Sequence, residues 1–341
     1  MLNYIIFFIS LFLTNPLRVY LLKKRILISL SGDNHQKYSN STVVPLIGGL
    51  LIFILISNLY FFYIDSNFYY FLFFTLILGL SSDLKIFKSA FLKLLIQIFL
   101  IYYMVYFSDL KLDNIGINII DNLNTNIIFN YIFVTFCIII IINGSNFIDG
   151  MNGLSLGYFI LILFILLKIE IFPFDKEINN FFLISLIIIL FLNFKNLLFL
   201  GDNGSYSLGI FFSYILIKIY NDNNFSPFFV ILLLWYPSFE LLFSIIRKFN
   251  FHKSPMLPDT KHLHQLLYFY VLTKFKKNNL ISNNLTSLII NFYNFAIFLL
   301  SSLFYQNSEI QIFLIIVSII IYCILYRYLI LWKLNLKFFK K

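Results

Sequence analysis

Long hydrophobic runs alternate with short polar breaks along nearly the whole chain. A helix needs about 20 largely apolar residues to cross a bilayer core roughly 30 Å thick. The runs predict about eleven membrane-spanning helices under that rule, at residues 2–22, 44–64, 68–80, 90–107, 128–142, 154–172, 181–194, 206–220, 227–246, 285–305 and 310–332. The third, fifth and seventh runs are short, so these helices are expected to extend into the flanking polar residues. The pattern therefore predicts an all-α, polytopic integral membrane protein.

Composition leads to the same fold class. Hydrophobic residues occupy 60% of the 341 positions and charged residues 12%, against roughly 45–50% and 25% in soluble domains. A water-soluble fold of this size could not bury so much apolar surface. We expect one transmembrane domain over residues 1–341, with cytoplasmic loops near 23–43, 81–93, 143–153, 195–205 and 247–284.

Charge predicts the orientation of the chain. Basic residues gather in the connections after odd-numbered spans, whereas most acidic residues follow even-numbered spans. The positive-inside rule then places the N-terminus outside and the C-terminus in the cytoplasm. The net charge of +10 reflects this distribution, because no basic block is interleaved with polar sequence as on a nucleic-acid-binding surface. We expect the lipid bilayer as a partner, and no nucleic acid.

Polar segments rich in glycine or histidine also follow the odd-numbered spans. They lie at residues 31–49, 81–93, 143–153, 201–205 and 252–265. Five loops that place such residues on one membrane face are typical of an active site assembled at that face. We therefore predict a catalytic domain with its site on the cytoplasmic side.

The segment NGSNFIDGMNGL, at residues 143–154, is the most informative of these. Asn146, Asp149 and Asn152 are three apart, so on a helical turn they would share one face. Its glycines would let backbone amides approach a ligand closely. Helix caps also use Asn, Asp and Gly, but a cap needs only one or two of them. The pattern therefore favours a binding segment.

The segment GDNGS, at residues 201–205, directly precedes a span. Backbone amides at a helix N-terminus offer a site for an anion such as phosphate. Asp202 beside a phosphate indicates a divalent cation between them, and Mg²⁺ typically takes one or two carboxylates plus phosphate oxygens. A capping Asp in a tight turn explains this segment, taken alone, about equally well.

Charged residues and histidines elsewhere add candidates. Asp83 lies at the cytoplasmic end of the third span, and Lys93 lies near the start of the fourth, where a lysine either snorkels or meets an anion. His262 and His264 lie in the longest cytoplasmic loop. This spacing is weak for a zinc site, and phosphate binding suits the basic surroundings better. An interfacial amphipathic loop is the alternative for the histidines.

Five segments together resemble the polyprenyl-phosphate N-acetylhexosamine-1-phosphate transferases, the superfamily that includes the phospho-muramoyl-pentapeptide translocase of peptidoglycan synthesis. They are PLIGG at 45–49, GLSSD at 79–83, NFIDGMNG at 146–153, FLGDNGS at 199–205 and PDTKHLH at 258–264. The resemblance implies that a UDP-N-acetylhexosamine gives its sugar-1-phosphate to undecaprenyl phosphate, releasing UMP. The product would start a lipid-linked cell-surface glycan such as O-antigen. The resemblance also implies a bacterial inner-membrane location and Mg²⁺, with Mn²⁺ as a substitute; we also consider a homodimer.

Position within these motifs implies a role for each candidate residue. The implied catalytic residues are Asp83, Asp149, His262 and His264. The implied metal ligands are Asp202 and Asp149. The implied substrate-binding residues are Lys93, Asn146, Asn152, Gly204 and Lys261. Asp83 would act as the base or as the carboxylate that orients the nucleophile.

The chain departs from the family pattern at several positions. Ser82 and Asn152 stand where the family usually has acids, and Gln265 stands where it usually has a further His. The change at Ser82 leaves open a catalytically inactive relative that acts as a scaffold. A transporter or lipid flippase is the alternative from another class, because Glu240 is an ionisable residue within the ninth span.

Overall fold

The computed structural model describes residues 2–29, 43–63, 65–87, 89–223, 225–250, 254, 260–275 and 278–338. The helices in these residues are α1 (Leu2–Lys24), α2 (Gly48–Tyr63), α3 (Ser66–Asp83), α4 (Ala90–Phe107), α5 (Asn118–Asn124), α6 (Ile127–Ile148), α7 (Leu154–Lys168), α8 (Lys176–Phe194), α9 (Gly201–Asp222), α10 (Pro227–Leu233), α11 (Trp235–Asn250), α12 (Leu263–Phe275), α13 (Asn279–Leu303) and α14 (Ser308–Phe338). The predicted all-α class is confirmed. Parts of the loops predicted at 23–43 and 247–284, and Pro258 and Asp259 of the fifth motif, lie outside the described residues.

Each predicted span has a helical counterpart, and the three short runs extend as expected. Helix α3 continues to Asp83, α6 continues to Ile148, and α8 begins at Lys176. The two loop helices α5 and α12 were not predicted. The ninth run was expected to be one helix, but it divides into α10 and α11, whose axes differ by 71°.

The break between α10 and α11 has a physical cause in Pro237. Proline has no backbone N–H, so it cannot donate to the carbonyl four residues earlier. That carbonyl belongs to Leu233, and it accepts a hydrogen bond from the Tyr158 hydroxyl at 2.9 Å instead. The chain can therefore bend here without leaving the carbonyl unsatisfied, which is essential in a membrane.

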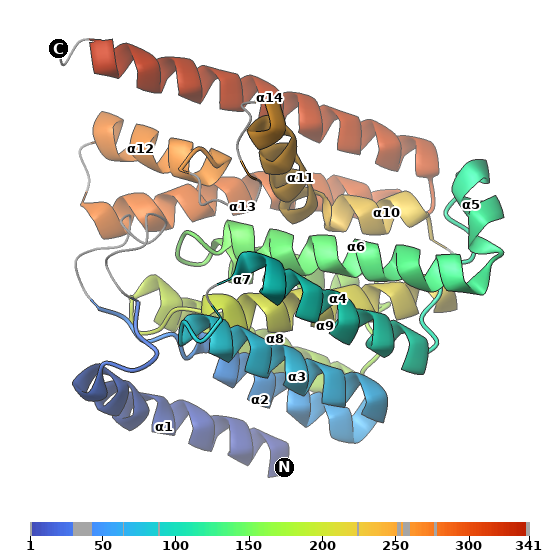
Figure 1. Ribbon diagram of the computed structural model, residues 1–341, viewed down its shortest axis with the longest axis horizontal. Coiled ribbons are helices and arrows are strands. Elements are labelled where there is room, and N and C mark those ends of the chain that lie inside the picture. Colours follow the sequence, from blue (N-terminus) through green and yellow to red (C-terminus); the bar gives the residue numbers. More distant parts are fainter. Residues whose placement is uncertain are drawn as a thin grey trace.

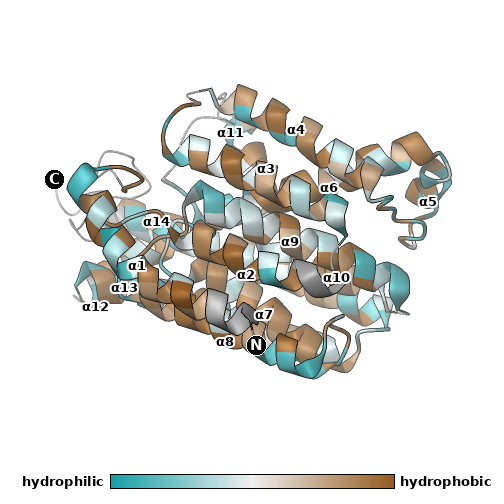
Figure 2. Ribbon diagram, turned by 90° about the horizontal axis from the view of Figure 1, so that it is seen from below, coloured by the Kyte–Doolittle hydropathy of each residue, from teal (hydrophilic) through white to brown (hydrophobic). Residues whose placement is uncertain are grey.

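Among the described residues, five helices are long and apolar enough by themselves to cross a bilayer, and the bent pair α10–α11 would make a sixth. They are α4, α6, α8, α13 and α14. Figure 2 shows hydrophobic residues along most of the bundle and hydrophilic residues near its ends. The structure thus supports a multi-pass membrane protein, while eleven spans and their orientation stay predictions.

Helix α9 lies inside the bundle and packs against α2, α3 and α6 (Figure 1). Its residues from 203 to 219 are buried except Lys218, although several of them are small and polar. Ser207 satisfies its hydroxyl by donating to the Asn203 carbonyl at 2.7 Å. A Cβ added to Gly209 would lie 2.8 Å from the Cα of Ile142 in α6. Small residues thus let the helix backbones approach closely, which strengthens their packing.

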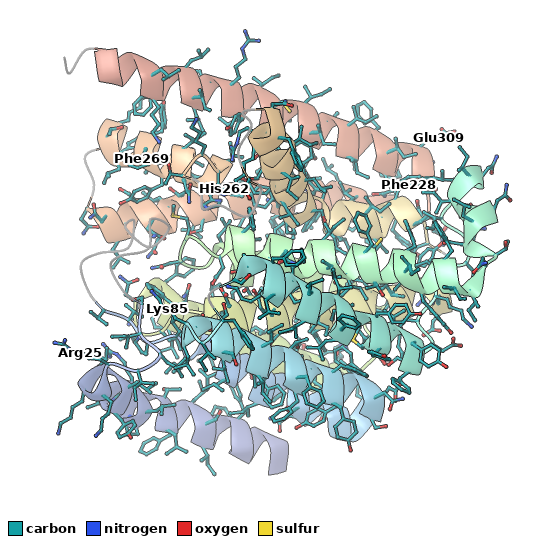
Figure 3. The ribbon with its side chains drawn as sticks, in the orientation of Figure 1. Arg25, Lys85, Phe228, His262, Phe269 and Glu309 are labelled. Atoms are coloured by element: carbon teal, nitrogen blue, oxygen red, sulfur yellow. The ribbon has the colours of Figure 1, made fainter. Side chains whose placement is uncertain are left out.

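Most helices run in similar directions, and α11 crosses them steeply (Figure 1). Arg25, Lys85 and His262 lie toward one end of the bundle, whereas Phe228 and Glu309 lie toward the other (Figure 3). Two basic residues that follow odd-numbered spans thus lie toward the same end as His262.

Candidate active site

A cavity of about 1100 Å³ brings most of the predicted site residues together. The predicted residues that line it are Asp83, Lys93, Asn146, Asp149, Asn152, Asp202, His262 and His264. Two others lie away from its lining. Gly204 is buried against Gly49, where a Cβ would lie 3.1 Å from the Gly49 nitrogen. The exposed Lys261 accepts a hydrogen bond from Arg247 through its carbonyl. Their substrate-binding roles stay predictions, and the geometry gives Gly204 a packing contact.

Glycines allow α2, α3 and α9 to meet beside this cavity. A Cβ added to Gly79 in α3 would lie 2.4 Å from the Cα of Asn203, and one added to Gly49 would lie 2.6 Å from the Asn203 carbonyl carbon. The segment before α2 also bonds to the segment before α9, because the Phe199 amide donates to the Pro45 carbonyl at 2.9 Å. The PLIGG, GLSSD and FLGDNGS motifs therefore join through their backbones.

Asp83 caps the N-terminus of α9. Its Oδ1 accepts from the Asp202 amide at 2.9 Å, and its Oδ2 accepts from the Asn203 amide at 3.1 Å. Gly201 has a φ of 71°, and a Cβ there would lie 2.7 Å from Oδ2 of Asp83, so glycine is required. We expected these amides to bind phosphate. They bind a carboxylate of the protein itself instead, because Asp83 reaches them from α3.

Asp149 completes a cluster of three carboxylates with Asp83 and Asp202. Asp149 follows the end of α6 and is hydrogen-bonded to the Gly201 amide. Both Asp83 and Asp149 lie beyond the apolar parts of their helices. Burial, followed by the charge of Asp202, raises the pKa of Asp83 to about 7. The same causes in that order raise the pKa of Asp149 well above its ordinary value. Such mutual repulsion between carboxylates favours a bound cation.

The turn between α6 and α7 corrects the predicted shared face of Asn146, Asp149 and Asn152. Helix α6 ends at Ile148, so only Asn146 of the three is helical. The amide of Asn152 donates to Oδ1 of Asn283 in α13 at 2.7 Å. All three residues still line the cavity, but the tertiary contacts of a turn bring them there rather than helical periodicity.

Lys93 reaches the carboxylate cluster from the first turn of α4. Its Nζ donates to Oγ of Ser82 at 2.9 Å and lies 4.0 Å from Oδ2 of Asp202. Ser82 in turn donates to the same Oδ2 of Asp202. The lysine therefore meets an anionic group, as one of the two interpretations predicted. We call the three carboxylates Asp83, Asp149 and Asp202, together with Ser82 and Lys93, the carboxylate wall.

His262 and His264 form the second part of the lining, which we call the histidine wall. Their rings are nearly parallel, with 5.5 Å between centroids. His264 is fully buried, and a Cβ added to Gly150 would lie 2.9 Å from its Nε2. Nδ1 of His262 lies 2.9 Å from Oε1 of Glu240. Glu240, an ionisable residue within the ninth apolar run, is the sequence feature that favours a transporter. In the structure it supports the histidine wall.

The donor atoms of the carboxylate wall suit a hard cation. Mg²⁺ prefers oxygen ligands and usually completes its coordination with water and substrate phosphates. Within the described residues, no three His, Cys, Asp or Glu side chains are grouped so that they could hold a metal ion by themselves. A cation held by Asp202 and Asp149 would therefore need further oxygen ligands, which a phosphate-bearing substrate could provide.

The cavity continues past its polar end between apolar side chains. These include Ile98 and Tyr102 of α4, Ile132 and Phe136 of α6, and Ile245 of α11. A second, almost wholly apolar cavity of about 320 Å³ shares Ile140 and Leu242 with the first. The lining of the first cavity, polar at one end and apolar beyond it, would suit an amphiphile with an anionic head and a hydrocarbon tail.

Comparison with known proteins gives one family and two relatives. Residues 66–220 match glycosyl transferase family 4. This range includes the carboxylate wall but neither the PLIGG motif nor the histidine wall. The chain is 28% identical over 316 residues to a Bacillus subtilis (strain 168) protein named probable undecaprenyl-phosphate N-acetylglucosaminyl 1-phosphate transferase. That match covers 87% of this chain and 84% of the relative.

A second relative comes from Thermotoga maritima. It is named undecaprenyl-phosphate alpha-N-acetylglucosaminyl 1-phosphate transferase, and it is 26% identical to the chain over 261 residues. That match covers 76% of this chain and 78% of the relative. Both relatives are named for the same sugar and the same lipid acceptor.

Proposed function

We propose that this chain transfers N-acetylglucosamine-1-phosphate from UDP-N-acetylglucosamine to undecaprenyl phosphate and releases UMP. The chain belongs to glycosyl transferase family 4, which supports this proposal. The observation that carries the proposal is the cavity, which joins a polar end to an apolar extension. A UDP-sugar needs the polar end, and a polyprenyl phosphate needs both. The names of the two relatives support N-acetylglucosamine as the sugar.

The reaction is a phosphoryl transfer. A phosphate oxygen of undecaprenyl phosphate attacks the β-phosphorus of the UDP-sugar and forms the new P–O bond. The bond from that phosphorus to the bridging oxygen breaks, and UMP leaves with the electron pair. A phosphate monoester has a second pKa near 6, so the acceptor is mostly a dianion at neutral pH and needs no strong base. Asp83 then serves better as an orienting carboxylate than as a base, which agrees with its bonds to the α9 amides.

Positioning and charge neutralisation supply most of the catalysis in such reactions. Lys93, whose Nζ lies 4.0 Å from Oδ2 of Asp202, would contact a phosphate oxygen placed beside that carboxylate. His262 and His264 face the same cavity and would contact the diphosphate. Mg²⁺, with Mn²⁺ as a substitute, would be held by Asp202 and Asp149 and would neutralise phosphate charge.

The proposal includes a location. We place the chain in a bacterial inner membrane, with the cavity facing the cytoplasm, where UDP-sugars are available, and its product at the start of a lipid-linked glycan such as O-antigen. The grouping of Arg25 and Lys85 at the cavity end supports this orientation. A reporter fused after Lys341 should read cytoplasmic, and one inserted at Asp113 should read external. Reversal of either would remove the basis for the orientation.

The direct test uses purified protein in liposomes that contain undecaprenyl phosphate. With UDP-N-acetylglucosamine and Mg²⁺ we expect release of UMP and formation of a lipid-linked sugar diphosphate. A panel of other UDP-hexosamines measures donor preference. UMP release that needs no lipid acceptor would contradict the proposed transfer. Absence of release with every donor would favour the inactive scaffold.

A further inference from the structure

Behind the histidine wall, Glu240 is a carboxylate with almost no exposure to solvent. Its exposed fraction is 1%, and it lies in the second half of the bent pair, on α11. A carboxylate in such a place is costly unless donors satisfy its oxygens. Each of its donors should therefore be identifiable, and each should reveal what the residue holds in place.

Three groups meet the two oxygens of Glu240. Oε1 lies 2.9 Å from Nδ1 of His262 and accepts from the amide of Leu263 at 3.2 Å. Oε2 accepts from the hydroxyl of Tyr322 in α14 at 2.8 Å. An ionised carboxylate only accepts hydrogen bonds, so with the Tyr322 and Leu263 donors in place, Nδ1 of His262 is expected to carry a proton. The chain thus binds the edge of the imidazole that faces away from the cavity.

The hydrogen bond made by one imidazole nitrogen sets the role of the other. With Nδ1 directed to Glu240, Nε2 is the nitrogen of His262 left for a ligand in the cavity, which His262 lines. A ring held in this way cannot turn to exchange its two nitrogens. When the ring is protonated, Nε2–H becomes a donor for a phosphate oxygen, and Glu240 balances the positive charge.

Arg247, two helical turns after Glu240, holds the same segment from its other side. It donates to the Lys261 carbonyl and to the Tyr326 hydroxyl, the latter at 2.6 Å. Tyr322 and Tyr326 are four residues apart, so they lie on one face of α14. Helix α11 therefore holds residues 261–263 through Glu240 and Arg247, each of which is bound by a tyrosine of α14. Of these two side chains, Glu240 is the one that contacts an imidazole nitrogen.

We infer that Glu240 is a positioning residue for the transfer reaction, which fixes His262 with Nδ1–H toward Glu240 and Nε2 toward the phosphate groups of the substrate. The catalytic consequence of this inference rests on the proposed function. The orientation of the His262 ring is independent of that function. Glu240 acts through His262 and does not contact substrate. Tyr322 supports it by occupying the other carboxylate oxygen.

A double-mutant cycle tests the inference in the full-length protein reconstituted in liposomes. Glu240→Gln should lower UMP release roughly 10–100-fold, the usual range for loss of an orienting partner. His262→Asn should lower it at least as much. If Glu240 acts only through His262, the double variant should be no slower than His262→Asn alone. Losses that multiply would overturn the inference. Glu309→Gln, at an exposed site near the far end of the bundle, should keep the wild-type rate.

A second measurement does not depend on activity. ¹⁵N NMR of the protein labelled at histidine reports which ring nitrogen carries the proton, and loss of a signal in His262→Asn assigns that signal. We expect Nδ1 of His262 to be protonated in the wild type and a mixture of proton positions in Glu240→Gln. An unprotonated Nδ1 in the wild type, or an unchanged signal in the variant, would overturn the inference. If the wild type releases no UMP, the proposed function fails while this measurement still decides the role of Glu240.

Discussion

The carboxylate wall lies where helix backbones meet at glycines, whereas the histidine wall is held mainly by long side chains. Asp83 binds two amides of α9, and Gly79 brings α3 against Asn203. His262 depends instead on the side chain of Glu240, which depends on Tyr322. Backbone contacts through glycine leave little room for adjustment, while side chains can rotate. The carboxylate wall should therefore tolerate less change than the histidine wall.

The largest effect is expected from Asp202→Asn in the carboxylate wall. The change keeps the volume of the side chain but removes the charge that faces the proposed cation and Lys93. UMP release should fall by roughly 10³-fold, the scale for removing a central electrostatic group, while the thermal unfolding temperature stays near the wild-type value. Asp222→Asn, at the exposed far end of the same helix, is the matched control. A wild-type rate for Asp202→Asn would show that the charge of Asp202 has no part in the transfer.

Gly79→Ala tests whether backbone contact holds the carboxylate wall. The added Cβ would lie 2.4 Å from the Cα and 2.7 Å from the nitrogen of Asn203, and backbone atoms cannot move aside cheaply. We expect a loss of about 1–3 kcal/mol in the free energy of unfolding, measured by denaturant titration in detergent, with a matching loss of activity. Ser81→Ala, two residues later, should change neither. An unaltered stability for Gly79→Ala would break the comparison between the walls.

Gly150→Ala is the corresponding change beside the histidine wall. Its added Cβ would meet the ring of His264, with 2.9 Å to Nε2 and 3.5 Å to Cδ2. Because this neighbour is the end of a side chain, it can turn away with little cost in folding free energy. We expect stability within about 0.5 kcal/mol of wild type but a fall in UMP release of about tenfold, as His264 leaves its position. Strong destabilisation would mean that the two walls are equally rigid.

The smallest effect is expected at Ser82, where the chain departs from the family pattern. Its hydroxyl links Lys93 to Asp202, and loss of one such hydrogen bond costs about 1 kcal/mol. Ser82→Ala should therefore lower UMP release by only about fivefold. Ser82→Asp, which restores the usual acid, tests the scaffold alternative, because activity that appears only in this variant would show that Ser82 marks a lost catalytic acid.

The histidine wall also shows where local sequence reasoning was incomplete. The ninth run was expected to be one helix, yet it bends before Pro237, and the bend is stabilised by the Tyr158 hydroxyl from another helix. Glu240 is recognisable in the sequence as an acid within an apolar run, but its partner His262 lies 22 residues later in a different segment. Periodicity within one helix cannot reveal a contact between two helices, so the transport interpretation of Glu240 rested on missing information.

Local patterns of residues were sufficient to assign the class of the protein and most members of its site. Runs of apolar residues specify helices wherever water is excluded, because only a helix satisfies its own backbone within one segment. Short polar motifs interrupt these runs, so Asp83, Asp149, Asp202 and the two histidines could be selected before any contact was known.

The groups that these residues contact are known only from the tertiary structure. Asp83 turned out to bind the α9 amides that were expected to bind phosphate, and Asn152 turned out to lie in a turn rather than on a helical face. Hydrogen bonds act over about 3 Å, whereas partners such as Asn152 and Asn283 are 131 residues apart along the chain. Their pairing depends on how whole helices pack, which no local pattern of residues encodes.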